Sequence, residues 1–340
     1  MKILNRFKRT VKILSIDGGG VRGYIPVLIL EALAALLREK GKPDDFSSHF
    51  DIIAGTSSGS LTALALTIPE TSEEDPSVLL RKPKYSISDI VNIYETRSTD
   101  IFPLLPLSGL QFIKQAFREK YDDEGFEKVL EDIFGSNTVD DSLTDILISS
   151  YDLKSDSPVM IKKSHQNALG ENFFMKDVAR GSSAAPTYFE PHIMKSLSGK
   201  TEYCLVDGAM AANNPSLCAY TEARSLFPGA KNFIIFSVGT GKIPHHWDYM
   251  NARNWGFLDW ISPQNGSPLY SIMKGAQEQC LDSQITIIPG VKYYRINPVL
   301  GKRNSNIDNA SPQNMKQLRA TAEKSIEENM KLLKKIADML

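Results

Sequence analysis

Three short motifs carry residues whose types and spacing could hydrolyse an ester. Gly55–Gly59 reads Gly-Thr-Ser-Ser-Gly and offers a serine nucleophile, and Asp207-Gly208-Ala209 offers a carboxylate base. Earlier in the chain, Asp17–Gly23 reads Asp-Gly-Gly-Gly-Val-Arg-Gly and offers unhindered backbone N–H groups. A nucleophile, a base and donors for a developing oxyanion are the parts that a serine hydrolase needs. None of the motifs contains a histidine, which narrows the kind of serine hydrolase that they could form.

The second motif has the G-x-S-x-G spacing of a nucleophile elbow. It follows a short apolar run, Asp51–Ala54, and it opens a segment of small and apolar residues, Ser58–Leu66, that is suited to a helix. On such a strand-to-helix turn the serine hydroxyl projects from the carboxyl end of the strand, and the glycines relieve crowding. The spacing selects Ser57 as the nucleophile and leaves Ser58 in the variable position.

An aspartate is a better candidate than a histidine for the base that accepts the serine proton. A conventional triad has the order serine, acid, histidine; His245 and His246 come late enough, but no pattern specifies either. Asp207 directly follows a predicted strand, Tyr203–Val206. In a doubly wound sheet the carboxyl ends of the strands face one crevice, so we expect Asp207 to meet Ser57 there. Partial burial would make the carboxylate basic enough to take the proton.

The glycine run also matches the dinucleotide-binding pattern G-x-G-x-x-G. Gly18, Gly20 and Gly23 have this spacing between a predicted strand and a predicted helix. The pattern requires an acidic residue about 20 positions later, at the end of the next strand. Asp44 and Asp45 are at that distance, but they stand in a turn-like segment with no strand before them. The dinucleotide interpretation is therefore disfavoured.

An oxyanion site is the favoured interpretation of the same glycines. Backbone N–H groups at a helix N-terminus attract negative charge, and without Cβ atoms a substrate carbonyl can approach the backbone closely. Arg22 would add a fixed positive charge beside them. The alternative is a tight turn in which the glycines serve packing alone.

The first part of the chain predicts the elements that would position these motifs. Val11–Ile16 is a compact, β-branched run typical of a buried parallel strand. A helix is expected to begin at Pro26, where a missing N–H costs nothing, and to extend to about Lys40. Together with Asp51–Ala54 and Ser58–Leu66, the order is strand, helix, strand, helix. This order predicts an α/β fold with a mainly parallel central sheet.

The rest of the chain predicts a single domain over residues 1–340, without internal repeats or linkers. We expect a surface loop at Thr71–Lys84 and a mainly helical segment at Ile87–Phe134. Further predicted elements are strands at Leu143–Ser149, Pro158–Lys162, Tyr203–Val206 and Phe233–Val238, a short helix at Val178–Ser183 and an amphipathic helix at Gln313–Leu340.

Composition and charge narrow the possible partners and the location. The chain has 39 basic and 40 acidic residues, so its net charge of −1 creates no field that favours nucleic acid or an anionic membrane. Cys204, Cys218 and Cys280 include no C-x-x-C pair, which argues against a disulfide framework or a zinc site. Neither a signal peptide nor a stretch approaching about 20 apolar residues is apparent, so we expect a soluble, cytoplasmic protein.

Taken in order, the three motifs resemble those of the patatin-like phospholipases, the plant patatins and their bacterial relatives. That family has a DGGGxRG-type oxyanion segment, a GxSxG elbow and a D-G-A/G motif, and all three are unbroken here. The similarity extends from about residue 11 to about residue 300. It also includes Ser183–Phe189, Asn213-Asn214-Pro215, Ser237–Gly241, Trp255–Leu258 and Tyr294-Arg295-Ile296.

The resemblance implies a three-layer α/β fold related to that of cytosolic phospholipase A2, with helices flanking a mainly parallel sheet. The site residues that it implies are a dyad of Ser57 and Asp207, and an oxyanion hole from the backbone around Gly18, Gly19 and Gly20 with Arg22 nearby. The implied reaction is hydrolysis of fatty acyl esters in phospholipids, galactolipids or lysolipids through an acyl-serine intermediate, with no metal or cofactor required.

Contact with the lipid surface is expected to be peripheral and transient. The aromatic residues of Tyr94–Phe134, or Trp247, Trp255 and Trp260, could line an acyl groove or touch a membrane, although aromatic residues at helical spacing more often belong to a core. Three alternatives remain open. They are an esterase for soluble acyl esters, a membrane-degrading effector activated by a nucleotide second messenger, and a non-catalytic binding protein on the same scaffold.

Overall fold

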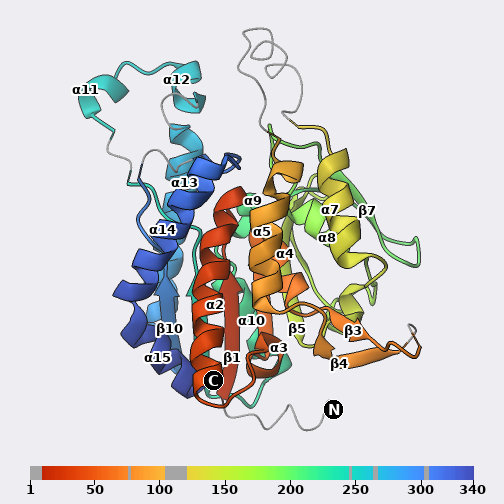
Figure 1. The fold of residues 1–340 in the computed structure, drawn as a ribbon. Coiled ribbons are helices and arrows are strands. Elements are labelled where there is room, and N and C mark those ends of the chain that lie inside the picture. Colours follow the sequence, from red (N-terminus) through yellow and green to blue (C-terminus); the bar gives the residue numbers. More distant parts are fainter. Residues whose placement is uncertain (1–9, 76–77, 104–120, 245–246, 263–266, 302–305) are drawn as a thin grey trace.

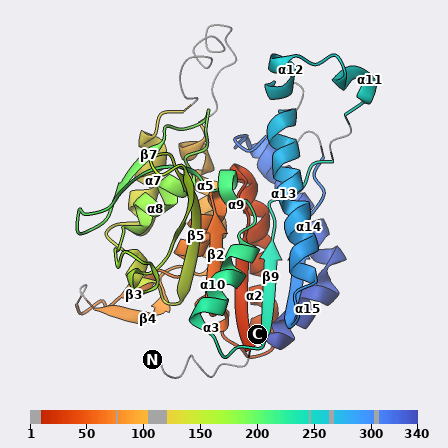
Figure 2. The same cartoon turned by 180° about the vertical axis from the view of Figure 1, so that it is seen from behind.

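The computed structural model describes residues 10–75, 78–103, 121–244, 247–262, 267–301 and 306–340. Figure 1 and Figure 2 show a central sheet with helices on both faces. The strand order is β10-β9-β1-β2-β5-β8-β7, and β6 pairs with β5. The strands are β1 Thr10–Ile16, β2 Ile52–Thr56, β5 Asp145–Asp152, β6 Ser157–Ile161, β7 His192–Lys195, β8 Glu202–Asp207, β9 Asn232–Val238 and β10 Val291–Ile296. The predicted α/β fold with a central sheet is confirmed.

The parallel part of the sheet carries the first two motifs. β1 pairs in parallel with β2 and β9, β10 pairs in parallel with β9, and β5 pairs in parallel with β2. Ile16 lies opposite Gly55 in the register of β1 and β2. Because both strands end at this level, the glycine run after β1 and the elbow after β2 leave the sheet side by side.

One side of the sheet is antiparallel. β6 and β8 pair with β5, and β7 pairs with β8, all antiparallel. The four strands predicted after residue 140 correspond to β5, β6, β8 and β9. β7 and β10 have no counterpart in the sequence prediction. β7 is only four residues long, and Lys292 and Arg295 interrupt the apolar pattern of β10.

The helices form a layer on each face of the sheet. α2 (Tyr24–Glu39) lies at the front in Figure 1, and α10 (Ser216–Leu226) and α13 (Pro268–Thr286) lie at the front in Figure 2. Neighbouring residues of β1 reach different layers: Leu14 belongs to the core cluster that contains α2, and Ile13 to the cluster that contains α10. Alternation within a buried strand therefore produces two cores, and the predicted three layers are confirmed.

The most apolar part of the described chain is inside the molecule. Gly20–Glu39 is a 3₁₀ turn (Gly20–Gly23) followed by α2, and its mean hydropathy of 1.7 makes it long and apolar enough to cross a membrane. The expectation that no stretch approaches this length was therefore wrong. In the structure 78% of its most apolar window is buried, and α2 contacts α5, α14 and α15. A core helix surrounded by other helices is apolar on all sides, as a membrane-spanning helix is, because neither has a face toward water.

The predicted C-terminal helix is two helices. α14 spans Pro312–Glu328, α15 spans Met330–Met339, and Asn329 with a φ of −106° separates them. Both helices contact α2. Their buried apolar residues are Leu318, Ala322, Leu333, Ile336 and Ala337. The apolar face of the two helices therefore packs against α2.

The segment Thr71–Lys84 was predicted as a loop, and this is wrong. β3 (Pro69–Thr71) and β4 (Leu79–Pro83) form an antiparallel hairpin apart from the main sheet. β4 has no buried residue. Because the alternation of buried and exposed residues is the main sequence signal of a strand, a short exposed hairpin carries little of it.

The remaining helices are spread over both layers and beyond one end of the sheet (Figure 1). α5 (Ile87–Ile101) and α7 (Glu124–Phe134) lie at the two ends of the predicted helical segment Ile87–Phe134, of which residues 104–120 are outside the described part. The others are α3 Phe46–His49, α4 Ser58–Ala65, α8 Met175–Ser182, α9 Ala209–Ala212, α11 Tyr249–Ala252 and α12 Phe257–Ile261, with 3₁₀ turns at Val139–Asp141 and Ser164–Gln166.

Candidate active site

Ser57 stands on a sharp turn between β2 and α4. Its φ of 53° and ψ of −126° lie in a region that non-glycine residues rarely adopt. A Cβ on Gly59 would lie 2.3 Å from the carbonyl oxygen of Ile16, and one on Gly55 would lie 2.3 Å from the carbonyl oxygen of Gly59. Both motif glycines are therefore required by close backbone contacts. The geometry is that of a nucleophile elbow.

The structure brings Ser57 and Asp207 into direct contact. The Ser57 hydroxyl donates a hydrogen bond to Asp207 Oδ2 at 2.8 Å. The other carboxylate oxygen, Oδ1, accepts from the N–H of Ala209 at 2.8 Å. The N–H of Ser57 donates to Ser182 Oγ at 2.9 Å, a contact that no sequence pattern indicated. Both Ser57 and Asp207 are buried, so the pair has a fixed geometry with little water around it.

Asp207 reaches Ser57 on an antiparallel strand, whereas a doubly wound parallel sheet was expected. β8 is antiparallel to its neighbour β5, so the site is not a crevice between parallel strands. β5 continues beyond β2, since Ser149 is opposite Thr56 and three further residues follow it. β8 pairs with this extension in the reverse direction and ends with Asp207 opposite Ser150. Its carboxyl end therefore returns to the end of β2.

Burial makes Asp207 a stronger base than an exposed aspartate. Desolvation raises the pKa of its carboxyl from 3.8 to about 6, and the N–H of Ala209, the Ser57 hydroxyl and the charge of Lys274 oppose this rise. At neutral pH the carboxylate is still ionised and can accept a proton. Its affinity for that proton is higher than that of an aspartate in water.

The glycine run lies against Ser57, but its three N–H groups are not equivalent. The N–H of Gly18 donates to the carbonyl oxygen of Asn213 at 3.2 Å, and that of Gly19 donates to Ser58 Oγ at 3.2 Å. Gly20, with a φ of +58°, is the one of the three whose N–H has no acceptor within the described residues. The available donors for an oxyanion are therefore Gly20 and, if Ser58 rotates, Gly19.

Arg22 supports this loop from within the protein. The residue is only 4% exposed, and its Nε is 3.5 Å from the carbonyl oxygen of Gly19, at the outer limit for a hydrogen bond. Burial lowers the pKa of the guanidinium, while Tyr270, Glu278 and Tyr188 oppose this effect. Arg22 thus contributes a buried positive charge next to the glycine run.

A buried ion pair anchors the end of β1. Arg295 of β10 donates two hydrogen bonds to Asp17, at 3.0 Å to Oδ1 and 2.6 Å to Oδ2, and a third to Ser237 Oγ at 2.6 Å. Thr240 also donates to the carbonyl oxygen of Gly18 at 2.8 Å. Arg295 and Thr240 belong to segments that the family resemblance includes, but their roles could not be derived from the sequence.

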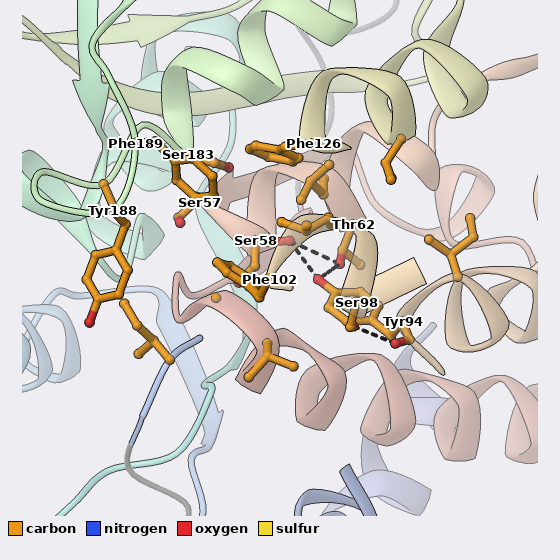
Figure 3. Close-up of a pocket in the computed structure, with 18 of the residues that line it drawn as sticks. Ser57, Ser58, Thr62, Tyr94, Ser98, Phe102, Phe126, Ser183, Tyr188 and Phe189 are labelled. Atoms are coloured by element: carbon orange, nitrogen blue, oxygen red, sulfur yellow. Dashed lines mark hydrogen bonds between the residues drawn. The ribbon is translucent and has the colours of Figure 1, made fainter. Parts of the chain in front are cut away.

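An apolar cavity opens beside Ser57 and Asp207 (Figure 3). Aromatic rings surround the part next to Ser57, since Phe102 and Phe126 each pack against Phe189 with ring centroids 5.9 and 5.3 Å apart. Tyr94, Phe102 and Phe126 of the predicted helical segment therefore belong to the core and also line this cavity. Phe112 and Phe117 lie outside the described residues.

Other candidates of the sequence analysis lie elsewhere. His245 and His246 are outside the described residues, and His192 is 3.5 Å from Asp177, not next to Ser57. Trp255 and Trp260 pack edge to face at 5.2 Å, in and beside α12. Across the described ranges, no group of three or more His, Cys, Asp or Glu side chains is arranged to hold a metal ion. The three cysteines are free thiols.

The fold and the site define an α/β protein with a serine–aspartate pair at the end of its sheet, and comparison with known proteins identifies its family. The family model for patatin-like phospholipases matches residues 14–219. The chain is 31% identical to Patatin-like protein 1 of Arabidopsis thaliana over 93% of its own length and 81% of that protein. It is 29% identical to Patatin-like protein 2 of rice over 95% and 85%. The chain belongs to the patatin-like phospholipase family.

Two further known proteins are similar to this chain. The chain is 32% identical, over 74% of its length and 69% of the relative, to a potato protein named "Probable inactive patatin-3-Kuras 1". Among solved structures, VipD from Legionella pneumophila aligns over 94% of this chain and 67% of that one, at 14% identity and a TM-score of 0.38.

Proposed function

We propose that the protein is a lipid acyl hydrolase of the phospholipase A or lysophospholipase type, with Ser57 as nucleophile and Asp207 as base. One observation carries the proposal: the 2.8 Å hydrogen bond from Ser57 Oγ to Asp207 Oδ2 lies in the wall of an apolar cavity. The pair supplies chemistry for an ester, and the cavity supplies a surface for a fatty acyl chain. Membership of a phospholipase family supports the same substrate class.

The first half of the proposed reaction acylates the serine. Asp207 takes the Ser57 proton while Oγ attacks the ester carbonyl carbon, and the N–H groups of Gly20 and Gly19 hold the oxyanion. One such donor is typically worth about 3–4 kcal/mol of transition-state stabilisation. The tetrahedral intermediate then expels the alcohol part of the lipid, which takes the proton from Asp207. The product is an ester between the fatty acid and Ser57.

In the second half of the proposed reaction, water is the nucleophile and Ser57 Oγ is the leaving group. A water molecule attacks the acyl carbonyl as Asp207 accepts one of its protons, and the same N–H groups hold the second oxyanion. Collapse of this intermediate breaks the bond to Ser57 Oγ, which recovers the proton from Asp207. The fatty acid leaves, and both residues return to their starting states.

The direct test uses Ser57→Ala and Asp207→Asn. The wild-type protein, incubated with phospholipid and lysophospholipid vesicles, should release fatty acids that mass spectrometry identifies, and a fluorophosphonate should label Ser57. Each variant should lose roughly 10³-fold or more of the rate, with an unchanged circular dichroism spectrum. Undiminished hydrolysis by either folded variant would exclude the dyad. Activity on short soluble esters alone would favour the soluble esterase, and activity only with an added cyclic oligonucleotide would favour the regulated effector.

We also propose that the protein works in the cytoplasm and touches membranes transiently through α11, α12 and the first turns of α13. The exposed apolar residues of these helices are Tyr249, Met250, Phe257, Leu258, Ile261, Leu269, Ile272 and Met273. In Figure 1 these helices lie at the same end of the sheet as α9, which directly follows Asp207. Tyr270 of α13 is close enough to Asp207 for that carboxylate to help raise its pKa, after burial, to about 12. Such a surface would bring the site to lipid.

Vesicle flotation tests this contact. Phe257 and Leu258 are 77% and 74% exposed, so replacing both by Ser should reduce binding to phosphatidylcholine vesicles and leave hydrolysis of a soluble ester unchanged. Leu169→Ser is the matched control, because Leu169 is 61% exposed and lies outside these helices. Because the surface is apolar, binding should persist at high salt. Equal flotation of wild type and double variant would contradict the proposed surface.

A further inference from the structure

The cavity beside Ser57 runs lengthwise between three helices. Its walls are formed by helix positions three or four apart, which share one face of each helix. From α4 these are Ser58, Leu61, Thr62 and Ala65, from α5 Ile90, Ile93, Tyr94, Ser98 and Ile101, followed by Phe102 at its end, and from α7 Phe126, Val129 and Ile133. A cavity lined along helices in this way is a channel with a direction, not a round pocket.

One end of the channel is next to Ser57. Phe102 follows the last turn of α5, and Phe126 stands in the first turn of α7. Both rings pack on Phe189, which lines the cavity together with Ser57. The end of α5 and the beginning of α7 therefore lie at the catalytic end.

The other end is closed by different residues of the same helices. The carbonyl oxygen of Ile133, near the end of α7, accepts from Tyr85 Oη at 3.1 Å and from Lys84 Nζ at 3.2 Å. The N–H of Lys84 in turn donates to the carbonyl oxygen of Ile68 at 2.9 Å. The end of α7 thus meets the chain just after α4 and just before α5. The cavity residues at this end are Ala65, Ile90 and Ile133, which are 3%, 2% and 6% exposed.

The lining positions span the same length on α4 and α7, and a longer one on α5, from Ile90 to Ile101. Seven residues separate Ser58 from Ala65 on α4, and seven separate Phe126 from Ile133 on α7. At a rise of 1.5 Å per residue, each interval is about 10 Å. The closed end therefore stands roughly 10 Å from the catalytic serine.

The hydroxyl groups that α4 and α5 contribute to the channel wall are already hydrogen-bonded. Tyr94 Oη donates to the carbonyl oxygen of Ser58 at 3.0 Å and lies 3.3 Å from Thr62 Oγ1, and Ser98 Oγ donates to the carbonyl oxygen of Tyr94 at 2.5 Å (Figure 3). Burial raises the pKa of Tyr94 to about 12, so its hydroxyl stays neutral. Along α4 and α5 a ligand finds no unsatisfied hydroxyl, which suits a hydrocarbon chain and disfavours a sugar or a peptide. Ser183 Oγ, which lies beside Ser57 at the catalytic end (Figure 3), is the lining hydroxyl that has no partner among the described residues.

We infer that this channel binds a single fatty acyl chain with its methyl end against Ala65, Ile90 and Ile133, and that these three residues set the preferred chain length. The inference rests on the proposed acyl hydrolase function and adds a length limit to it. Chains that reach the closed end gain contact with every added methylene. Longer chains must bend, or must displace Ala65, Ile90 and Ile133 from their packed positions at the closed end.

Substitutions at the closed end should change the length preference in opposite directions. Ala65→Leu fills the end of the channel, so kcat/KM for p-nitrophenyl decanoate, whose chain is about as long as the channel, should fall by about tenfold or more relative to kcat/KM for p-nitrophenyl butanoate, in one detergent. Ile133→Ala extends the channel, so the optimum should move to longer esters. Ala168→Leu adds the same atoms at an exposed position outside the channel and should leave the profile unchanged.

A binding measurement keeps the test independent of catalysis. In the Ser57→Ala background, fatty acids of increasing length are used to displace a fluorescent fatty acid. Affinity should rise with length and level off, at a shorter length with Ala65→Leu and at a greater length with Ile133→Ala. If no ester is hydrolysed but this pattern appears, the proposed function fails and the channel assignment stands. An unchanged length profile in either folded channel variant, with hydrolysis intact, would overturn the inference and leave the acyl hydrolase in place.

Discussion

Ser57 and Asp207 are 150 positions apart in the chain, and the Ser57 hydroxyl donates to Asp207 Oδ2 at 2.8 Å. β5 makes this contact possible, because it pairs with β2 in parallel and with β8 in the opposite direction. Gly208 allows the close approach of β8, since a Cβ there would lie 2.2 Å from the carbonyl oxygen of Ser149. The pair is therefore held by the sheet and not by flexible loops, which suits a preorganised site.

The backbone strain at Ser57 should be measurable as stability. At a φ of 53° any side chain with a Cβ is disfavoured, and such strain costs about 1–3 kcal/mol. Ser57→Ala and Ser57→Gly both remove the hydroxyl, but only Gly adopts this backbone freely. We expect Ser57→Gly to exceed Ser57→Ala in free energy of unfolding by about 1 kcal/mol in urea denaturation. Equal stability of the two variants would show that the turn is relaxed in solution.

The activity should depend on the ionisation of Asp207. Burial raises the pKa of this carboxyl to about 6, and only its ionised form can accept the Ser57 proton. On a soluble uncharged ester, kcat/KM should therefore rise with pH through about 6 and level off above 7. Circular dichroism at each pH provides the control for unfolding. A constant kcat/KM between about pH 4 and 8 would be incompatible with Asp207 as the base.

Lys274 should shift this profile. Its ammonium charge lowers the pKa of Asp207, while the pKa of Lys274 itself falls to about 8 through burial and the charge of Arg22, against Glu278, Asp17 and Asp207. Lys274→Met removes the charge, so the inflection of kcat/KM should move to higher pH by up to about one unit. Above about pH 8 Asp207 is ionised in both proteins, so their rates should become equal.

The matched control for this shift is Lys324→Met. The Lys324 side chain is 76% exposed on α14, and its contact with Glu328 at 3.8 Å is a surface pair that solvent screens. Its replacement should leave the inflection where it is in the wild type. A shift in the same direction with Lys324→Met would mean that net charge, and not the position of Lys274, determines the profile.

The residues of the site were more predictable from the sequence than the topology that joins them. Ser57 and Asp207 each stand in a short motif, because an elbow and a tight strand end require glycine at fixed neighbouring positions. No comparable motif indicates whether β8 is parallel or antiparallel to its neighbour. A buried strand such as Leu205-Val206 has the same apolar residues whether it is parallel or antiparallel.

Contacts between residues far apart in the chain could also not be predicted from the sequence. Arg295 and Asp17 are 278 positions apart, and nothing local to either residue specifies the other. The free donor of the glycine run could not be singled out, because Asn213 and Ser58 occupy the N–H groups of Gly18 and Gly19 only in the folded chain. The channel requires three helices to meet, so its length follows from packing alone.

The ion pair of Arg295 and Asp17 should be essential to the fold. The side chains are 10% and 1% exposed, so removing one partner leaves a buried charge without compensation. Arg295→Met should lower the free energy of unfolding by about 3–5 kcal/mol. Arg38→Met is the control, because Arg38 and Asp44 form a 2.7 Å pair whose side chains are 51% and 45% exposed, and it should cost about 1 kcal/mol or less. Similar losses in both variants would contradict the anchoring role of Arg295.

Two glycine substitutions should have opposite effects on the molecule. A Cβ on Gly59 would lie 2.3 Å from the carbonyl oxygen of Ile16 and 2.7 Å from that of Asp17, and both contacts are with backbone that cannot move aside. Gly59→Ala should cost about 1–3 kcal/mol of stability. It should also lower kcat by about 10²-fold, because a displacement of Ser57 by about 1 Å separates it from the base and the oxyanion donors.

Gly275→Ala is the counterpart, since a Cβ there meets nothing within 4 Å inside α13. It should raise stability by about 0.5–1 kcal/mol and leave kcat unchanged. Thermal unfolding and ester hydrolysis measured on both variants would separate a steric effect at the elbow from a general intolerance of substitution, which would lower both quantities at both positions.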